Sequence, residues 1–447
     1  MSNGRPQRSA FGALVLLLVG TIFLIHNFRP DLIRWSWLGT WWPALLILWG
    51  VIRLFENLSG SGRRGVGGGE ISLLVLLILV GIAISFGSRY RDRIRVDLPD
   101  DVPFADSADV TEELPPKDLA PGSVVRINTS RGDIAVDGMS DARQLRVVVH
   151  KTGYAMSDEE ARSRASGATV NVRQSGKEVS LDATDAARRS GDVRVNFEVK
   201  VPRNVILDLR TQRGDVHASG ITGDVTASVA HGDVEVHDSG GDVRVDVGRG
   251  DVRVTTAKGN VHISGKGSEV EVEDVGGAAT IDGEFYGPIT ARNVARGARF
   301  VSQHTDLSIG GLPGRMDVES GELRVQDAVG PFLLTTSDKT INLEEISGRV
   351  RVQNKRGDIT VRLTAPPQDE IDLSNESGGV ELALPTKAAF EMSAASRSGQ
   401  IQNDLNDSGL NATQQGGDSK LEGKVGAHGP KITLNTSYGP IRLKHSD

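Results

Sequence analysis

The 447-residue sequence contains no cysteine. Disulfides, cysteine-ligated zinc sites, iron–sulfur clusters and thiol catalysis are therefore excluded. Aromatic residues are also scarce, at 4% of the chain, and the net charge of −7 does not indicate a basic surface patch. Nucleic-acid binding usually needs such a patch, so we expect no nucleic-acid partner.

Glycine is abundant, with 53 residues, and the apolar residues are mostly Val, Ile, Leu and Ala. A core of small aliphatic side chains turned by glycine is typical of repetitive β structure. No nucleophile elbow, P-loop or HExxH motif occurs. We therefore expect no catalytic residues, no cofactor and no enzymatic activity.

All tryptophans cluster near the N-terminus, which indicates a membrane–water interface. Three apolar runs surround them, over residues 10–28, 38–55 and 71–87. Each run is long enough to cross a bilayer as a helix, at about 1.5 Å per residue. The sequence thus predicts a membrane region over 1–87, not a cleaved signal peptide, with a lipid bilayer as partner. The expected interface residues are Trp35, Trp37, Trp41, Trp42 and Trp49.

The orientation of this membrane region rests on its basic residues, which are almost evenly divided between the two sides. The short basic N-terminus and the loop "GSGRRGVGGG" favour the cytoplasm. Three spans then place everything after Gly87 outside. We expect a protein integral to the cytoplasmic membrane, with a periplasmic or extracellular main domain.

Residues 10–55 read "GALVLLLVGTIFLIHNF", a short Trp-rich connection, then "WWPALLILWGVIRLF". This layout resembles the paired-helix membrane domain of LiaF-type envelope-stress proteins. The resemblance implies a regulatory membrane protein that senses envelope stress, and this is an alternative function.

A charged, Pro-rich stretch over residues 88–121 predicts a linker. Alternating apolar and polar residues then predict short strands over 122–447. One insertion, "SDEEARSRA" at residues 157–165, predicts a helix with Ser157 as its N-cap.

A nine-residue repeat dominates residues 214–365. Its frame slips once, where Tyr286 occupies the glycine position, and it shows clearly again from Gly321. In each Gly-Asp-Val-x-Val unit we expect glycine to turn the chain, aspartate to bond nearby turn N–H groups, and the valines to face inward. The expected repeat turns are Gly214, Asp215, Gly223, Asp224, Gly232, Asp233, Gly241, Asp242, Gly250 and Asp251.

Such a fixed period indicates a parallel β-helix or β-roll-like solenoid. Nine residues are too few for a full coil, so we expect two units per coil. One face should then stack Val216, Val234 and Val252, and the other Val225, Val243 and Val261. The fold class is an all-β solenoid preceded by an α-helical membrane region.

Four RGD tripeptides end at Asp133, Asp215, Asp251 and Asp358, but their Gly-Asp belongs to the repeat frame. We interpret them as structural. The stacked aspartates lack the Gly-Gly-x-Gly-x-Asp pattern of calcium-binding nonapeptides. Of histidines 217, 231, 237 and 262, the first and last fall on opposite sheets and the middle two flank one strand, so we interpret them as solvent-facing. No metal site is expected.

Residues from "GSVVRI" to the end resemble the bacterial putative-adhesin β-solenoid family, whose function is poorly defined. The resemblance is carried by "FEVKVPRNVILDLRTQRGDV", the serial "GDVxV" units and "SGQI…ITLNTSYGPIRL". It implies an adhesin-like or envelope scaffold protein that binds a surface, polysaccharide or envelope-protein ligand through outward residues such as Glu235, Arg244, Arg253 and Glu271. A polysaccharide-acting enzyme is a further alternative, which the few solenoid aromatics disfavour.

Overall fold

The structure is a computed structural model that describes residues 106–140, 143–183, 193–405 and 407–446. The three expected spans, their tryptophans and the start of the expected linker lie outside these residues. Among the helices of the described ranges, none has the length and apolar character needed to cross a membrane. The chain divides into two compact units.

The smaller unit includes the described residues 106–108 and Gly153–Ala165. Most of helix α4 (Asp158–Gly167) belongs to it, and Ala108, Ala155 and Ala161 form its small buried cluster. The hydroxyl of Ser157 accepts the N–H of Glu160 at 3.4 Å, and the carbonyl of Ser157 accepts that of Ala161. The helix therefore begins at the N-cap expected from the sequence.

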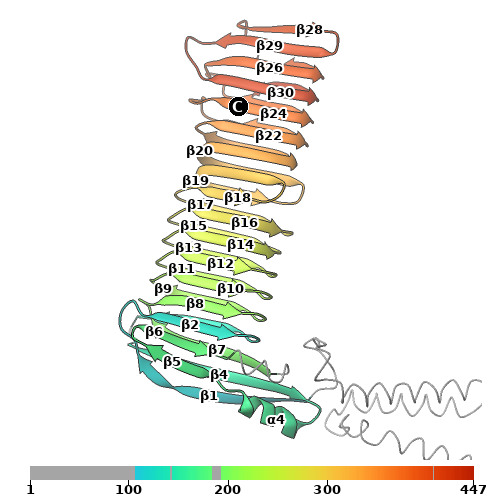
Figure 1. Cartoon of the computed structure of the whole chain (residues 1–447). Coiled ribbons are helices and arrows are strands. Elements are labelled where there is room, and N and C mark those ends of the chain that lie inside the picture. The colour runs from blue at the N-terminus through green and yellow to red at the C-terminus, as the bar shows by residue number, and fades with distance from the viewer. Residues whose placement is uncertain (1–105, 141–142, 184–192, 406, 447) are drawn as a thin grey trace, which may run out of the picture. The chain divides into compact units, whose positions relative to one another are not determined.

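The larger unit, Asp109–Thr152 with Ser166–Asp447, is a β-solenoid (Figure 1). Its lower coils form two series of strands. Face A contains β2 (Val124–Thr129), β6 (Glu178–Asp182), β8 (Ile206–Thr211), β10 (Val225–Val229), β12 (Val243–Val247), β14 (Val261–Gly267), β16 (Ala279–Phe285) and β18 (Ala298–Val301). Face B contains β3 (Ile134–Met139), β7 (Val193–Pro202), β9 (Val216–Ile221), β11 (Val234–Ser239), β13 (Val252–Ala257), β15 (Val270–Val275) and β17 (Ile289–Val294).

The strand register confirms two nine-residue units per coil. Val234 pairs in parallel with Val216 below and Val252 above, each 18 residues away. Val225, Val243 and Val261 stack in the same way on the other face. All these valines are at most 1% exposed. Because equivalent side chains pack on each other in every coil, stability accumulates in small increments of about 1.5–3 kcal/mol per buried aliphatic side chain.

Each regular face B strand contains one residue with a positive φ, a feature that the sequence analysis did not anticipate. The residues stack with the coil period, and most are not glycine: Gly220, Asp238, Thr256, Asp274 and Asn293, with φ between 48° and 67°. The strand register skips this position on both partner strands without shifting, so the pairing is interrupted at the same point in each coil.

The parallel stack is interrupted by a hairpin of two long strands, β19 (Thr305–Val318) and β20 (Glu322–Asp338). β19 runs antiparallel to β18 with its first half and to β17 with its second half. β20 pairs antiparallel with β19 and restores the original chain direction. Within the nonapeptide array expected over 214–365, residues 305–338 thus reverse the chain twice.

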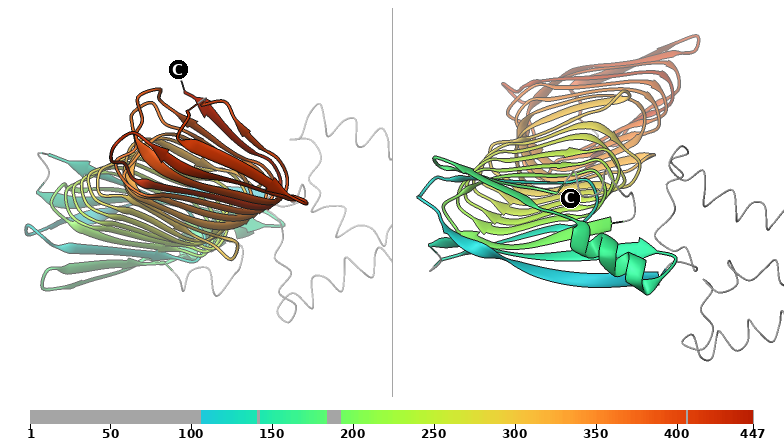
Figure 2. Two further views of the ribbon diagram at one scale, coloured as in Figure 1. Left: turned by 90° about the horizontal axis from the view of Figure 1, so that it is seen from above. Right: turned by 60° about the horizontal axis from the view of Figure 1, so that its bottom comes forward.

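Above the hairpin the coils resume. Face A continues with β22 (Val350–Arg356), β24 (Ile371–Ser377), β30 (Lys431–Tyr438) and β26 (Phe390–Ser398). Face B continues with β21 (Thr340–Ser347), β23 (Ile359–Arg362), β25 (Val380–Leu384), β31 (Ile441–His445) and β27 (Ile401–Asn403). Figure 2 shows these strands overlying one another from coil to coil.

At both ends of the solenoid, spatial order departs from chain order. The β2–β3 coil lies between β6–β7 and β8–β9. Likewise the last coil, β30–β31, lies between β24–β25 and β26–β27. The first and last coils in the chain therefore pair with a coil on each side. The coils β6–β7 and β26–β27 lie beyond them in the stack.

Further strands cover the two ends. β5 (Asn171–Ser175) covers β6, and β4 (Gln144–Ala155) pairs with β7 and with β1 (Asp106–Asp118). At the other end β29 (Asp418–Val425) covers β26, and β28 (Leu410–Gln415) covers β29. Residues 106–118, which the sequence assigned to a linker, thus form a strand instead.

Candidate functional site

The aspartates of the repeat form a ladder along the corner that leads from face A to face B, here called the first corner. Asp133 accepts the backbone N–H of Asp215 at 3.0 Å. Asp215 accepts that of Asp233, and Asp233 accepts that of Asp251, both at 2.8 Å. Asp251 does the same for Glu269 at 3.0 Å. The sequence placed these bonds within one turn; the structure places them between coils.

The opposite corner, from face B to face A, carries a second ladder. Asp224 accepts the N–H of Asp242 at 2.9 Å, and Asp242 accepts that of Asn260 at 2.7 Å. Asn260 continues the ladder to Ala278 at 3.0 Å. An amide oxygen thus accepts at Asn260 the same kind of hydrogen bond that a carboxylate accepts at Asp224 and Asp242.

A Cβ would clash with the preceding coil at the glycines of both corners, and those of the first corner also have a positive φ. Gly214, Gly232 and Gly250 of the first corner have φ between 134° and 141°, a region that disfavours any side chain. Gly223 and Gly241 of the opposite corner have no such φ. A Cβ at Gly223 would meet the Val205 carbonyl oxygen at 2.2 Å, and one at Gly241 would meet Asp224 Oδ1 at 2.4 Å. There glycine is needed for close approach of successive coils.

The RGD tripeptides are held in this corner framework. Gly132 donates its N–H to the Arg213 carbonyl at 2.8 Å, and Gly214 donates to the His231 carbonyl at 2.9 Å. Asp358 accepts the N–H of Gly379 at 2.7 Å, and Arg356 forms an ion pair with Asp338. These backbone and carboxylate contacts differ from a flexible loop tip that presents RGD to a receptor.

The acidic and histidine side chains of the solenoid are its candidate metal ligands. Within the described ranges, no group of three or more His, Asp or Glu side chains is placed to hold a metal ion. His217 lies on face B and His262 on face A. His217 Nδ1 lies 3.2 Å from Glu235, and His237 Nδ1 lies 2.8 Å from the Thr255 hydroxyl.

The outward positions of both faces form straight columns of polar side chains. On face B the register stacks His217, Glu235, Arg253 and Glu271. Arg253 donates to Glu271 at 2.7 Å, and this hydrogen bond raises the pKa of Arg253. On face A the register stacks Thr226, Arg244 and His262. The residues that the sequence expected to point outward thus do so at neighbouring positions on a regular lattice.

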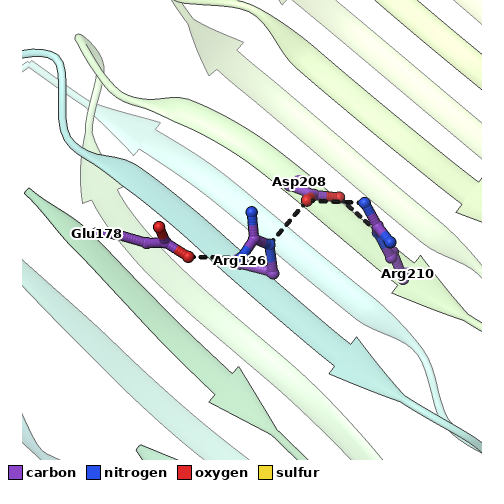
Figure 3. A network of polar contacts seen from close by, with 4 residues as sticks. All are labelled: Arg126, Glu178, Asp208 and Arg210. Atoms are coloured by element: carbon purple, nitrogen blue, oxygen red, sulfur yellow. Dashed lines mark hydrogen bonds and ion pairs between the residues drawn. The ribbon is translucent and has the colours of Figure 1, made fainter. Parts of the chain in front are cut away.

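A charged network ties the β2–β3 coil into face A (Figure 3). Arg126 on β2 donates to Glu178 on β6 at 2.5 Å and to Asp208 on β8 at 2.8 Å. Arg210 also donates to Asp208, at 2.8 Å. Burial would raise the pKa of Asp208, but the hydrogen bonds from Arg210 and Arg126 outweigh it and lower that pKa. The network favours ionised Asp208 and locks three neighbouring strands in register.

Sequence reasoning missed two features of the surface. The first is the column of positive-φ residues, for which the only signal was Asp or Asn recurring at the seventh position of alternate units, counted from the glycine position. The second is an opening at the first corner between Tyr286 and Lys339. The frame slip at Tyr286 was its signal, but a slip alone does not reveal a chain reversal.

The chain is similar to one protein family and to solved structures of bacterial proteins. The family described as Toastrack DUF4097 matches residues 186–444. A putative cell adhesion protein from Clostridium sporogenes is 8% identical, with 76% of this chain and 100% of that chain covered and a TM-score of 0.19. A putative adhesin from Bacteroides fragilis is 10% identical, with 75% and 97% covered and a TM-score of 0.19. No curated protein matches the chain.

Proposed function

Because the chain belongs to the Toastrack DUF4097 family, we propose that it is an adhesin-like binding or scaffold protein of the cell envelope that works without catalysis. The observation that carries the proposal is the stack of outward columns on both faces. Glu235, Arg253 and Glu271 project from successive coils whose backbones are fixed by parallel pairing and by the corner ladders. A rigid array of this kind suits many weak contacts with a repetitive surface, since linked contacts add avidity without strong single sites.

The membrane is the proposed anchor. The support is in the sequence: three apolar runs and the tryptophans between Trp35 and Trp49. With the N-terminus in the cytoplasm, the solenoid lies outside and meets periplasmic or external partners. Protease added to intact cells or spheroplasts tests this placement. We expect digestion of the solenoid; protection until the inner membrane is lysed would contradict it.

Adhesion is tested by removing one outward column at a time. The variant Glu235→Ala/Arg253→Ala/Glu271→Ala removes three outward side chains of the face B column. The variant Thr226→Ala/Arg244→Ala/His262→Ala removes three outward side chains of the face A column. Each serves as the control for the other, because both leave the inward valines unchanged. We expect cells with one of the variants to adhere less than cells with the wild-type protein. If both variants and a deletion strain adhered as well as the wild type, the proposal would be refuted.

A second candidate function is envelope-stress regulation. It is favoured by the LiaF-like layout of residues 10–55. Deletion of the gene would then change the response of envelope-stress reporters to antibiotics that act on the cell wall. An unchanged response would count against regulation and leave the adhesin-like function in place.

A further inference from the structure

The double chain reversal leaves the first corner without a connecting segment for part of the stack. β18 turns back into β19 at residues 302–304, where Ser302 donates its N–H to the Thr305 carbonyl at 2.8 Å. β19 turns back into β20 at residues 319–321, where Glu319 donates to the Glu322 carbonyl at 2.8 Å. Both turns stay on their own face. β19 passes from face A to face B at the opposite corner, and β20 passes back there, so neither strand closes the first corner.

This opening is a notch of about 340 Å³. Corner residues 286–288 border it below, and Lys339 borders it above. Its floor includes Phe300 and Ile289, which are only 5% and 2% exposed. The hydroxyls of Thr305 and Thr336 lie in the same floor, 2.9 Å from each other. The notch therefore combines an apolar base with polar atoms, as small-ligand sites do.

Aromatic residues gather at the notch in a chain that has few. Phe285, Tyr286 and Phe300 line it. Tyr286 is 84% exposed, the largest value among the exposed large hydrophobic side chains of the described residues. It stands where the repeat would have glycine, so the one slip of the frame places an aromatic ring at the mouth of the opening. An exposed ring with no packing role is typical of a binding surface.

Three of the charged groups at the rim, Glu284, Asp338 and Lys339, are engaged by the protein itself. Glu284 accepts the N–H of Gln303 at 2.7 Å, and Asp338 is paired with Arg356. Lys339 donates to the carbonyls of Glu319 and Ser320, and burial lowers its pKa. The notch thus offers hydrogen-bonding groups without a dominant charge, which suits a neutral ligand.

We propose that the notch bordered by Tyr286 and Lys339 binds a neutral saccharide unit. This inference rests on the proposed adhesin-like function and names its ligand class. A pyranose ring has an apolar C–H face that stacks on an aromatic ring and a hydroxyl edge that meets carbonyl, hydroxyl and carboxylate acceptors. The volume is at the lower end of ligand sites, about 300–1,000 Å³, and accommodates one or two sugar rings.

The test uses the full-length protein in a detergent without sugar groups. Saturation-transfer NMR is recorded with glucose, galactose, mannose, N-acetylglucosamine and N-acetylgalactosamine at millimolar concentration. We expect a signal from at least one sugar, weakened about tenfold in affinity by Tyr286→Ala. Ser320→Trp, which fills the rim of the notch, should also weaken binding.

The matched control is Tyr438→Ala, since Tyr438 is also exposed, at 59%, but lies outside the notch. It should bind like the wild type. Absence of signal from every sugar, or equal affinity in Tyr286→Ala, would overturn the proposal. Adherence of cells that persists in either case leaves the proposed function standing. Saccharide binding at the notch without any adherence would instead refute the proposed function alone.

Discussion

The carboxylate of Asp215 accepts the backbone N–H of Asp233 at 2.8 Å, one full coil later in the chain. The same relationship repeats from Asp133 to Glu269, so the corner of each coil is bonded to the corner of the next. The aspartates of these RGD tripeptides are therefore part of a ladder of hydrogen bonds between coils, and this is their structural role.

The ladder predicts different effects for two changes at Asp233. Asp233→Ala removes the acceptor for the Asp251 N–H and should lower the free energy of unfolding by about 1–2 kcal/mol. Asp233→Asn should cost less than about 0.5 kcal/mol, because Asn260 already performs this role in the other ladder. Urea unfolding measures both. Equal destabilisation would show that charge, not the acceptor, is what matters.

The positive-φ column predicts a stabilising substitution. Thr256 has φ 59°, a conformation that is strained for a β-branched residue. Asn293 occupies the equivalent position with φ 48°. Thr256→Asn should therefore raise the free energy of unfolding by about 1 kcal/mol. The same change at Thr226, which lies in regular strand β10, is the control and should not stabilise; a gain at both sites would rule out relief of strain.

The charged network predicts a pH-dependent contribution to stability. The folded-state pKa of Asp208 is lowered, so its contribution is present above the unfolded value of about 3.9 and is lost as pH falls through the folded value. Asp208→Asn should cost about 1 kcal/mol at pH 7, a figure reduced because Arg126 and Arg210 are partly exposed. The difference from wild type should shrink toward pH 3. Asp246→Asn, on the same face, is the control, and a pH-independent difference at Asp208 would contradict the network.

The inserted position of the last coil predicts an effect on strands that precede it in the chain. Leu434 on β30 is fully buried between β24 and β26. Leu434→Ala should cost about 2–5 kcal/mol and expose sites in both neighbouring strands to protease. The neighbouring exposed residue provides the control, since Asn435→Ala should change stability by less than about 0.5 kcal/mol. Cleavage confined to residues after β30 would argue against this arrangement.

The sequence alone determined the solenoid, its nine-residue unit, the two units per coil and the inward valines. It could do so because each unit makes the same contacts with the units 18 residues away, so local pattern and tertiary packing carry the same information. The helix beginning at Ser157 followed from capping chemistry that is also local. The membrane region over 1–87 stays a prediction.

Only the tertiary structure decided where the repeat stops being regular. The hairpin of β19 and β20, the inserted terminal coils and the strand formed by residues 106–118 depend on pairing between distant segments, which no period encodes. The aspartates of the corners illustrate the difference: their spacing is visible in the sequence, but the partner of each carboxylate is known only once the next coil lies above it. The notch beside Tyr286 arises in the same way, from two turns that are each ordinary and that leave a corner open only together.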